Sequence, residues 1–287
     1  LPISSLNTFS IMFDFPLILP SGIKVRVPEI TNQDVYALMK FCVFNDIEGF
    51  EKYVNIVIFN HIPSLSIIDK FYILLFLRVI YLGEEITFNL KESFTDKINV
   101  SLNLILEKFE QLTPPSNEVI IVDRFSIEVS IPTQLYFSTI DDLYFSLIRS
   151  VTFDGIKIDF DSITEMEKQK IYELLPPKFI RELQRFYTSL INTLGHLVVF
   201  EENKTFNVDE ISINFLSNQP CYFIKQLYSQ DINSFLEFMY QFVNKVGGSF
   251  NDFLKLNIND CKIMFNFYVE EIKKQNDELK KQNPKFK

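Results

Sequence analysis

The sequence predicts an α+β protein in two halves, in which helices alternate with small antiparallel sheets and hairpins and the C-terminal third is mostly helical. Three observations support this fold class. Residues 15–34 (FPLILPSGIKVRVPEITNQD) combine two strands, a turn and the capped start of a helix. Residues 67–81 repeat apolar side chains at three and four positions, the spacing of one helix face. From residue 221 onward the pattern is helical, with an interruption at Gly247 and Gly248.

The first half opens with a hairpin. An apolar run at residues 15–19 and an alternating run at residues 23–27 flank the turn residues Pro20, Ser21 and Gly22. Pro fixes φ and Gly tolerates positive φ, so the chain can reverse direction there without strain. The alternation predicts that the strand after the turn buries one face only.

Three helices are expected next, each from its apolar periodicity. They cover residues 32–44, 46–53 and 67–81. Ser66 marks the start of the third helix as its N-cap, and Gly83 marks its end.

Arg78 lies beside the apolar face of this third helix. A buried or half-buried Arg more often pairs with a carboxylate or caps carbonyl groups than contacts a ligand, so we interpret Arg78 as structural. The apolar run around it, residues 71–82, has only twelve residues. A bilayer core needs about 20 apolar residues, so the run predicts a buried helix and no membrane insertion.

Strands complete the first half, and we expect them to form one small sheet that the N-terminal hairpin joins. They are predicted at residues 85–90, 98–104, 118–122 and 125–131. We place a domain boundary near Thr139, with an N-terminal hairpin, helix and sheet domain (residues 1–138) before it. A helix-rich C-terminal domain (residues 139–287) with a long final helix follows.

The second half alternates helices and short strands in the same way. A helix is expected over residues 140–150, and Asp154 and Gly155 predict a type I′ turn between strands at residues 151–153 and 156–160.

Further helices follow in this half. Thr164 caps a helix that continues to Leu175, and Pro177 opens the next. Two or three strands are predicted within residues 196–215. The last helix starts near Ile258 and turns from aromatic to polar at Val269.

Composition limits the classes of function. The 287 residues are 47% hydrophobic, enough to fill a substantial core, and carry a formal net charge of -9. Because polyanion binding needs a concentrated positive field, we expect no nucleic-acid partner. Cys42, Cys221 and Cys261 are few and far apart, which argues against a disulfide framework and favours a reducing compartment.

No catalytic constellation stands out, so we predict that the protein is not an enzyme and uses no cofactor or metal. His61 and His196 lack His, Cys or carboxylate neighbours at ligand spacing, and no Gly-rich phosphate loop or nucleophile elbow is present. One enzymatic alternative is a hydrolase that pairs His196 with Asp209.

The order of these elements resembles the baseplate protein family of T-even-type contractile-tailed bacteriophages, a group that holds a baseplate hub subunit. The matching pieces extend over roughly the first two thirds of the chain, and the C-terminal third resembles the family more loosely. They are FPLILPSGIKVRVPEITNQD from Phe15, IDKFYILLFLRVIYLGEEITF from Ile68, IEVSIPT from Ile127 and ELLPPKFIRELQRFYTSL from Glu173.

The resemblance implies a structural protein of a phage tail baseplate, in the hub or an adjoining wedge, that binds other tail proteins in a large symmetric assembly. It would be located in the virion and, during assembly, in the host cytoplasm. The alternative is a tail assembly chaperone that binds tail proteins in the infected cell and is not retained in the virion.

Two regions are candidate partner contacts. Lys24 and Arg26 alternate with buried positions on the hairpin, so they face outward, where simple solubility also explains them. Because interface centres favour aromatic residues, the segment with Phe265, Phe267 and Tyr268 is the second candidate. The alternative is that these aromatic residues pack inside their own domain. In the polar helix end that follows, the candidate residue is Lys273.

Overall fold

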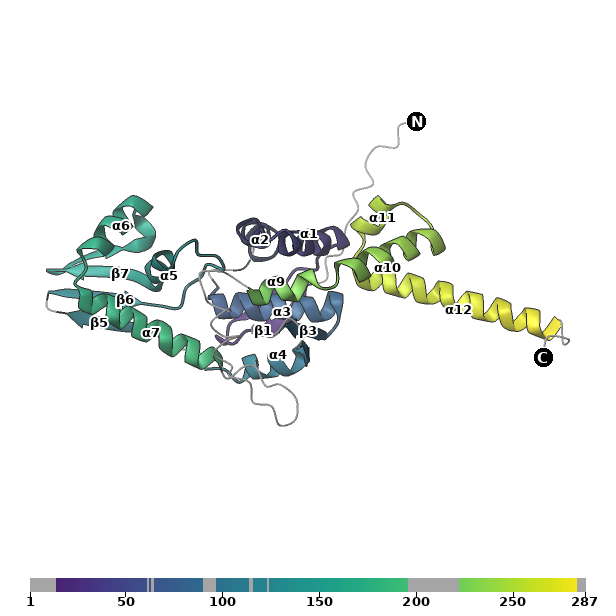
Figure 1. Cartoon of the computed structure of the whole chain (residues 1–287), viewed down its shortest axis with the longest axis horizontal. Coiled ribbons are helices and arrows are strands. Elements are labelled where there is room, and N and C mark those ends of the chain that lie inside the picture. The colour runs from purple at the N-terminus through teal and green to yellow at the C-terminus, as the bar shows by residue number, and fades with distance from the viewer. Residues whose placement is uncertain are drawn as a thin grey trace, which may run out of the picture.

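The fold is α+β, as predicted. The computed structural model describes residues 14–60, 62, 65–89, 97–113, 116–122, 124–195 and 222–282. Figure 1 shows an elongated molecule with a four-stranded sheet and its helices at one end, a layer of helices in the middle and the C-terminal helices at the other end. The strands predicted within residues 196–215 lie outside the described residues.

The elements follow in chain order. The strands are β1 (Phe15–Ile18), β2 (Lys24–Val27), β3 (Glu85–Asn89), β4 (Lys97–Ser101), β5 (Glu118–Val122), β6 (Phe125–Val129), β7 (Ile148–Phe153) and β8 (Ile156–Asp159). The helices of the first 195 residues are α1 (Asn32–Val43), α2 (Ile47–Val54), the π-helical η1 (Asn55–Phe59), α3 (Ile67–Leu82), α4 (Leu102–Glu110), α5 (Ile140–Leu147), the 3₁₀-helical η2 (Phe160–Ser162), α6 (Glu165–Leu174) and α7 (Pro177–Gly195). The C-terminal helices are α9 (Tyr222–Ser229), α10 (Ile232–Lys245), α11 (Phe250–Lys255) and α12 (Ile258–Gln282).

The N-terminal hairpin forms as predicted, with β1 and β2 paired antiparallel. The amide of Gly22, whose φ is 82°, donates to the carbonyl oxygen of Leu19 at 2.8 Å and closes the turn. The amide of Ser21 donates to Oδ1 of Asp69 at 3.1 Å, while Oδ2 of Asp69 accepts from the N-cap Ser66 of α3. One carboxylate therefore fixes the hairpin to the start of α3.

Helix α3 lies at the centre of the helical layer, and twelve of its sixteen residues are buried. A helix that is apolar on nearly all sides must be covered on nearly all sides, and α9 from the far end of the chain supplies part of that cover. The hydroxyl of Tyr228 in α9 donates to the carbonyl oxygen of Leu74 at 2.8 Å. The central core is thus built from segments that are distant in sequence.

The strands do not form the single sheet that the sequence predicted. The hairpin β1–β2 and the pair β3–β4 are separate two-stranded sheets, and β5–β6 continues into β7–β8 as a four-stranded antiparallel sheet. Helix α4 follows β4 in the chain, and the strand that pairs with β6 on its second side is β7, not a strand of the first two hairpins.

Helix α4 itself corrects the prediction of a strand over residues 98–104. The strand ends at Ser101, and Leu102, Ile105, Leu106 and Phe109 are buried at helical spacing. Burial of this stripe outweighs the strand preference of the first residues. The stripe was visible in the sequence and was missed.

The four-stranded sheet takes β5 and β6 from before residue 139 and β7 and β8 from after it. The division into residues 1–138 and 139–287 stays a prediction.

The local signals of the second half are confirmed. Asp154 and Gly155 have φ angles of 46° and 85°, which a type I′ turn requires. Thr164 and Glu167 form the predicted capping box of α6, and α7 begins at Pro177. The helix predicted over residues 140–150 ends earlier, at Leu147, because the next residues pair with β6 as β7.

Two cysteines are buried inside this fold. Burial raises the pKa of Cys261 to about 11 and raises the pKa of Cys42 further. Since the thiolate is the reactive form, we expect neither thiol to react with Ellman's reagent in the native variant Cys221→Ser, whereas both should react in urea. Rapid labelling of the native variant would contradict the packing around α1 and α12.

Candidate partner-binding surface

Lys24 and Arg26 lie on the outer face of β2, as predicted. Both side chains are exposed, while the alternate residues Val25 and Val27 are buried. Ile18, directly opposite Lys24 on β1, is also exposed. The hairpin thus presents two cations beside an apolar side chain, held in position by Asp69 of α3.

The aromatic residues of α12 divide between two faces of the helix. The ring of Phe265 lies 5.8 Å from that of Phe238 in α10, and Tyr268 lies 6.2 Å from Phe265, so this pair is half-buried against the protein's own core. Phe267 is 66% exposed. The sequence predicted that Phe265, Phe267 and Tyr268 form one contact region. Of these, only Phe267 has most of its surface exposed and available to a partner.

Phe267 belongs to an exposed apolar patch with Ile263 and Met264, which we call the α12 patch. Phe267 follows Ile263 by four positions and Met264 by three, so its side chain neighbours both on the helix surface. This spacing is present in the sequence, in IMFNF at residues 263–267. The sequence-based prediction considered only the aromatic residues and so missed Ile263 and Met264. Lys273 is exposed further along the same helix.

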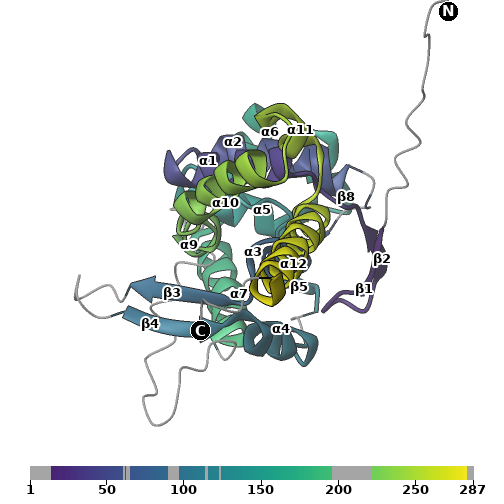
Figure 2. The ribbon, with the colours of Figure 1, turned by 90° about the vertical axis from the view of Figure 1, so that its right-hand side faces the viewer.

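Helix α12 projects from the body in Figure 1, and in Figure 2 it points toward the viewer. Its base is anchored through Asn32 at the start of α1. The Asn32 side-chain amide donates to the carbonyl oxygen of Phe253 at 2.9 Å, and Cys261 Sγ lies 3.3 Å from the same nitrogen. The backbone amide of Asn32 donates to Leu256 at 2.7 Å. Sequence reasoning missed this residue, because a contact across more than 220 positions has no local signal.

A second anchor confirms the structural interpretation of Arg78. Its guanidinium donates to the carbonyl oxygens of Leu227 (2.6 Å) and Gly83 (2.5 Å), and it pairs with Asp231 at 2.5 Å. Arg78 is 1% exposed. It therefore joins α3 to the connection between α9 and α10, through both interactions that the sequence suggested.

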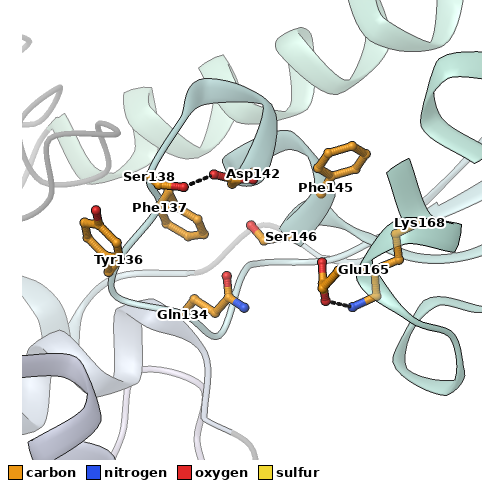
Figure 3. Close-up of a pocket in the computed structure, with 9 residues that line it drawn as sticks. All are labelled: Gln134, Tyr136, Phe137, Ser138, Asp142, Phe145, Ser146, Glu165 and Lys168. Atoms are coloured by element: carbon orange, nitrogen blue, oxygen red, sulfur yellow. Dashed lines mark hydrogen bonds and ion pairs between the residues drawn. The ribbon is translucent and has the colours of Figure 1, made fainter. Parts of the chain in front are cut away.

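A pocket of about 220 Å³ lies beside α5 and α6 (Figure 3). Its charged groups are held by neighbours: Asp142 accepts from Ser138 and from the Thr139 amide, and Glu165 pairs with Lys168 at 2.7 Å. Partial burial raises the pKa of Asp142, but the hydrogen bonds outweigh it and the pKa is lowered. A carboxylate held ionised in a helix cap is a poor general acid.

Glu51 and Lys70 are ionisable groups with perturbed pKa values. The carboxylate of Glu51 accepts from the amides of Leu135 and Tyr136 at 2.7 and 2.8 Å, and so holds the loop that borders the pocket. Burial raises the pKa of Glu51 and lowers that of Lys70. Lys70 donates to Asn55 at 3.1 Å, which satisfies part of its hydrogen-bonding capacity.

We expect Glu51 to make stability fall as the pH rises. An unfolded chain titrates this carboxyl near 4.5, and the folded pKa is higher. The contribution is therefore complete below about pH 4.5 and is lost as the pH rises through the folded pKa. Glu51→Gln removes it, so the free energy of unfolding of the wild type minus that of the variant should decrease from about pH 4.5 toward neutrality. Urea titrations that show an increase would contradict the burial of Glu51.

Among the residues that the structure describes, no cluster of three or more His, Cys, Asp and Glu side chains could hold a metal ion. His61, His196 and Asp209 lie outside those residues. No helix in the described ranges is long and apolar enough to cross a bilayer.

The fold and the surface define an α+β protein with two exposed candidate contact regions, the hairpin β1–β2 and the helix α12. The chain matches the family model described as T4 bacteriophage base plate protein over residues 12–220, which is more than half of its 287 residues. The protein therefore belongs to the T4-type phage baseplate family, as the resemblance implied. No curated protein and no solved structure shows significant similarity to it.

Proposed function

We propose that the protein is a non-enzymatic structural component of the baseplate, in the hub or an adjoining wedge, and that it binds other tail proteins. The observation that supports this proposal is the family match over residues 12–220. In this proposal the protein is present in the host cytoplasm during assembly and in the tail of the finished virion.

The partner contacts belong to the two exposed regions. Lys24 and Arg26 beside Ile18 suit a partner surface that is acidic with an apolar centre, whereas this chain is itself acidic. The α12 patch suits an apolar partner surface, because exposed aromatic and Met side chains are favoured at interface centres. Both regions lie on regular secondary structure, so their backbones already have a defined conformation before binding.

Quantitative mass spectrometry of purified tails tests the proposal. A structural component should be present at a fixed ratio to known baseplate proteins, and the ratio should survive a high-salt wash. Abundance in infected-cell extracts with absence from purified tails would overturn it and would establish the assembly chaperone instead.

A variant of His196 distinguishes a binding function from the hydrolase alternative. His196→Ala should leave tail assembly unchanged, because the proposed function depends on surface contacts. Loss of infectivity with normal tail assembly in this variant would support the hydrolase that pairs His196 with Asp209.

A further inference from the structure

The C-terminal part of α12 carries a direct repeat of seven residues. Residues 270–276 read EEIKKQN and residues 277–283 read DELKKQN. Residues that repeat every seven positions lie along one side of a helix, the side that faces another helix in a coiled coil. In heptad terms Ile272 and Leu279 occupy position a, and Gln275 and Gln282 occupy position d.

This seam continues a buried one. Ile258 and Cys261 occupy the preceding a and d positions and are buried. Phe265 and Tyr268 occupy the next pair; Phe265 packs against Phe238 of α10, and Tyr268 packs against Phe265. Beyond Tyr268 the seam has no cover within the described residues, since Ile272 is 37% and Leu279 59% exposed. Figure 1 shows this part of α12 extending away from α10 and α11.

The charges beside the seam are arranged by position. Glu271 and Glu278 flank it at position g, and each has Gln four residues later and Lys three residues later. Glu270 and Asp277, on the outer side at position f, each have Lys four residues later, which is the favourable intrahelical spacing. Neither Glu271 nor Glu278 makes an ion pair among the described side chains.

A second copy of this chain is a poor occupant. In an antiparallel pair the g positions face each other, so Glu271 and Glu278 would meet the same carboxylates of the other copy. In a parallel pair the two bases would lie side by side on the face that α10 already covers.

We propose that residues 269–282 of α12 bind an amphipathic helix of another protein, with apolar residues in its seam and Lys or Arg flanking them. The partner's cations pair with Glu271 and Glu278, and its apolar residues cover Ile272 and Leu279. Gln275 lies within the covered seam, so the partner offers an amide or hydroxyl opposite it, and this polar pair sets the register. The surface deepens the proposed function by naming the chemistry of one partner.

A designed peptide tests the proposal on the full-length protein. The probe is a fluorescein-labelled helical peptide with Leu at a and d, except for one Asn, and Lys at e and g. The control peptide has the same composition with the Lys residues moved to b, c and f. Fluorescence anisotropy at about 0.15 M salt should show at least tenfold tighter binding of the first peptide, because ordinary attraction to an acidic protein acts equally on both.

Variants locate the contact on α12. Ile272→Asp and Leu279→Asp should each weaken binding of the first peptide at least tenfold, whereas Ile263→Asp, on the opposite face, should not change it. The double variant Glu271→Lys, Glu278→Lys should instead prefer a peptide with Glu at e and g. Circular dichroism verifies that each variant is folded.

Several outcomes would overturn the proposal: equal affinity for the two peptides, an equal effect of Ile263→Asp and Ile272→Asp, or no reversal in the double variant. Dimerisation of the free chain that Ile272→Asp abolishes, seen by analytical ultracentrifugation, would assign the seam to a second copy. These measurements use the purified protein and peptides. Their failure can therefore be distinguished from failure of the proposed function, which mass spectrometry of purified tails tests.

Discussion

Replacing Arg78 by Ala should lower the free energy of unfolding by about 3 to 5 kcal/mol, the usual cost of removing one partner from a buried ion pair. The guanidinium donates to the carbonyl oxygens of Leu227, Gly83 and Glu85 and pairs with Asp231, from a position that is 1% exposed. Without it the carbonyl oxygens of Leu227 and Gly83 lose a charged donor, and the buried Leu227 carbonyl is left without that partner. Urea unfolding followed by circular dichroism measures the change.

Two companion variants separate the sources of this loss. Asp231→Asn should cost less than Arg78→Ala, because Asn keeps an Oδ1 acceptor and the guanidinium keeps its carbonyl partners Leu227 and Gly83. Arg78→Lys should fall between them, since an ammonium group keeps the charge but cannot reproduce the planar set of donors. A loss of less than about 1 kcal/mol for Arg78→Ala would show that the anchor contributes little net stability.

Local signals in the sequence were enough to predict most individual elements. Thr31, Ser66 and Thr164 cap helices where expected, and Gly22 and Gly155 adopt the positive φ that their turns require. Each of these features depends on residues within a few positions of one another. Such interactions are therefore readable without knowledge of the rest of the fold.

The pairing of strands could not be predicted from such local signals. Nothing in β6 indicates that its second neighbour is β7, which follows after a loop and helix α5, because alternation specifies a buried face and not a partner. Helix α4 was missed for a different reason. Its apolar stripe begins directly after β4, and a strand and a helix compete for the same residues there.

For the candidate surface, too, local patterns were predictable and contacts between distant elements were not. Lys24 and Arg26 could be placed outward from alternation alone, and the structure confirms it. The faces of α12 could not be assigned, because the sequence does not say which side α10 covers. Asn32, which anchors that helix through Phe253, could not be predicted because its hydrogen-bond partner lies 221 positions away in the sequence.

Replacing Phe253 by Ala should strongly destabilise the attachment of the C-terminal helices. Phe253 is fully buried, and its ring lies within 5.4 to 6.0 Å of the rings of Phe235, Phe238 and Phe242 in α10. Truncation removes the ring that joins α11 to α10 and leaves a cavity between them. We expect a loss of about 3 to 5 kcal/mol in the free energy of unfolding.

Phe250→Ala is the matched control, because Phe250 lies one turn earlier in α11 and is 49% exposed. Its truncation should change the free energy of unfolding by less than about 1 kcal/mol. The Phe253→Ala variant should also expose the Cys261 thiol to Ellman's reagent, since Asn32 contacts both the Phe253 carbonyl and Cys261. Equal losses in the two variants, or unchanged thiol protection, would mean that the base of α12 is held by other contacts. The attachment of α12 to the body would then not depend on the Phe253 aromatic cluster.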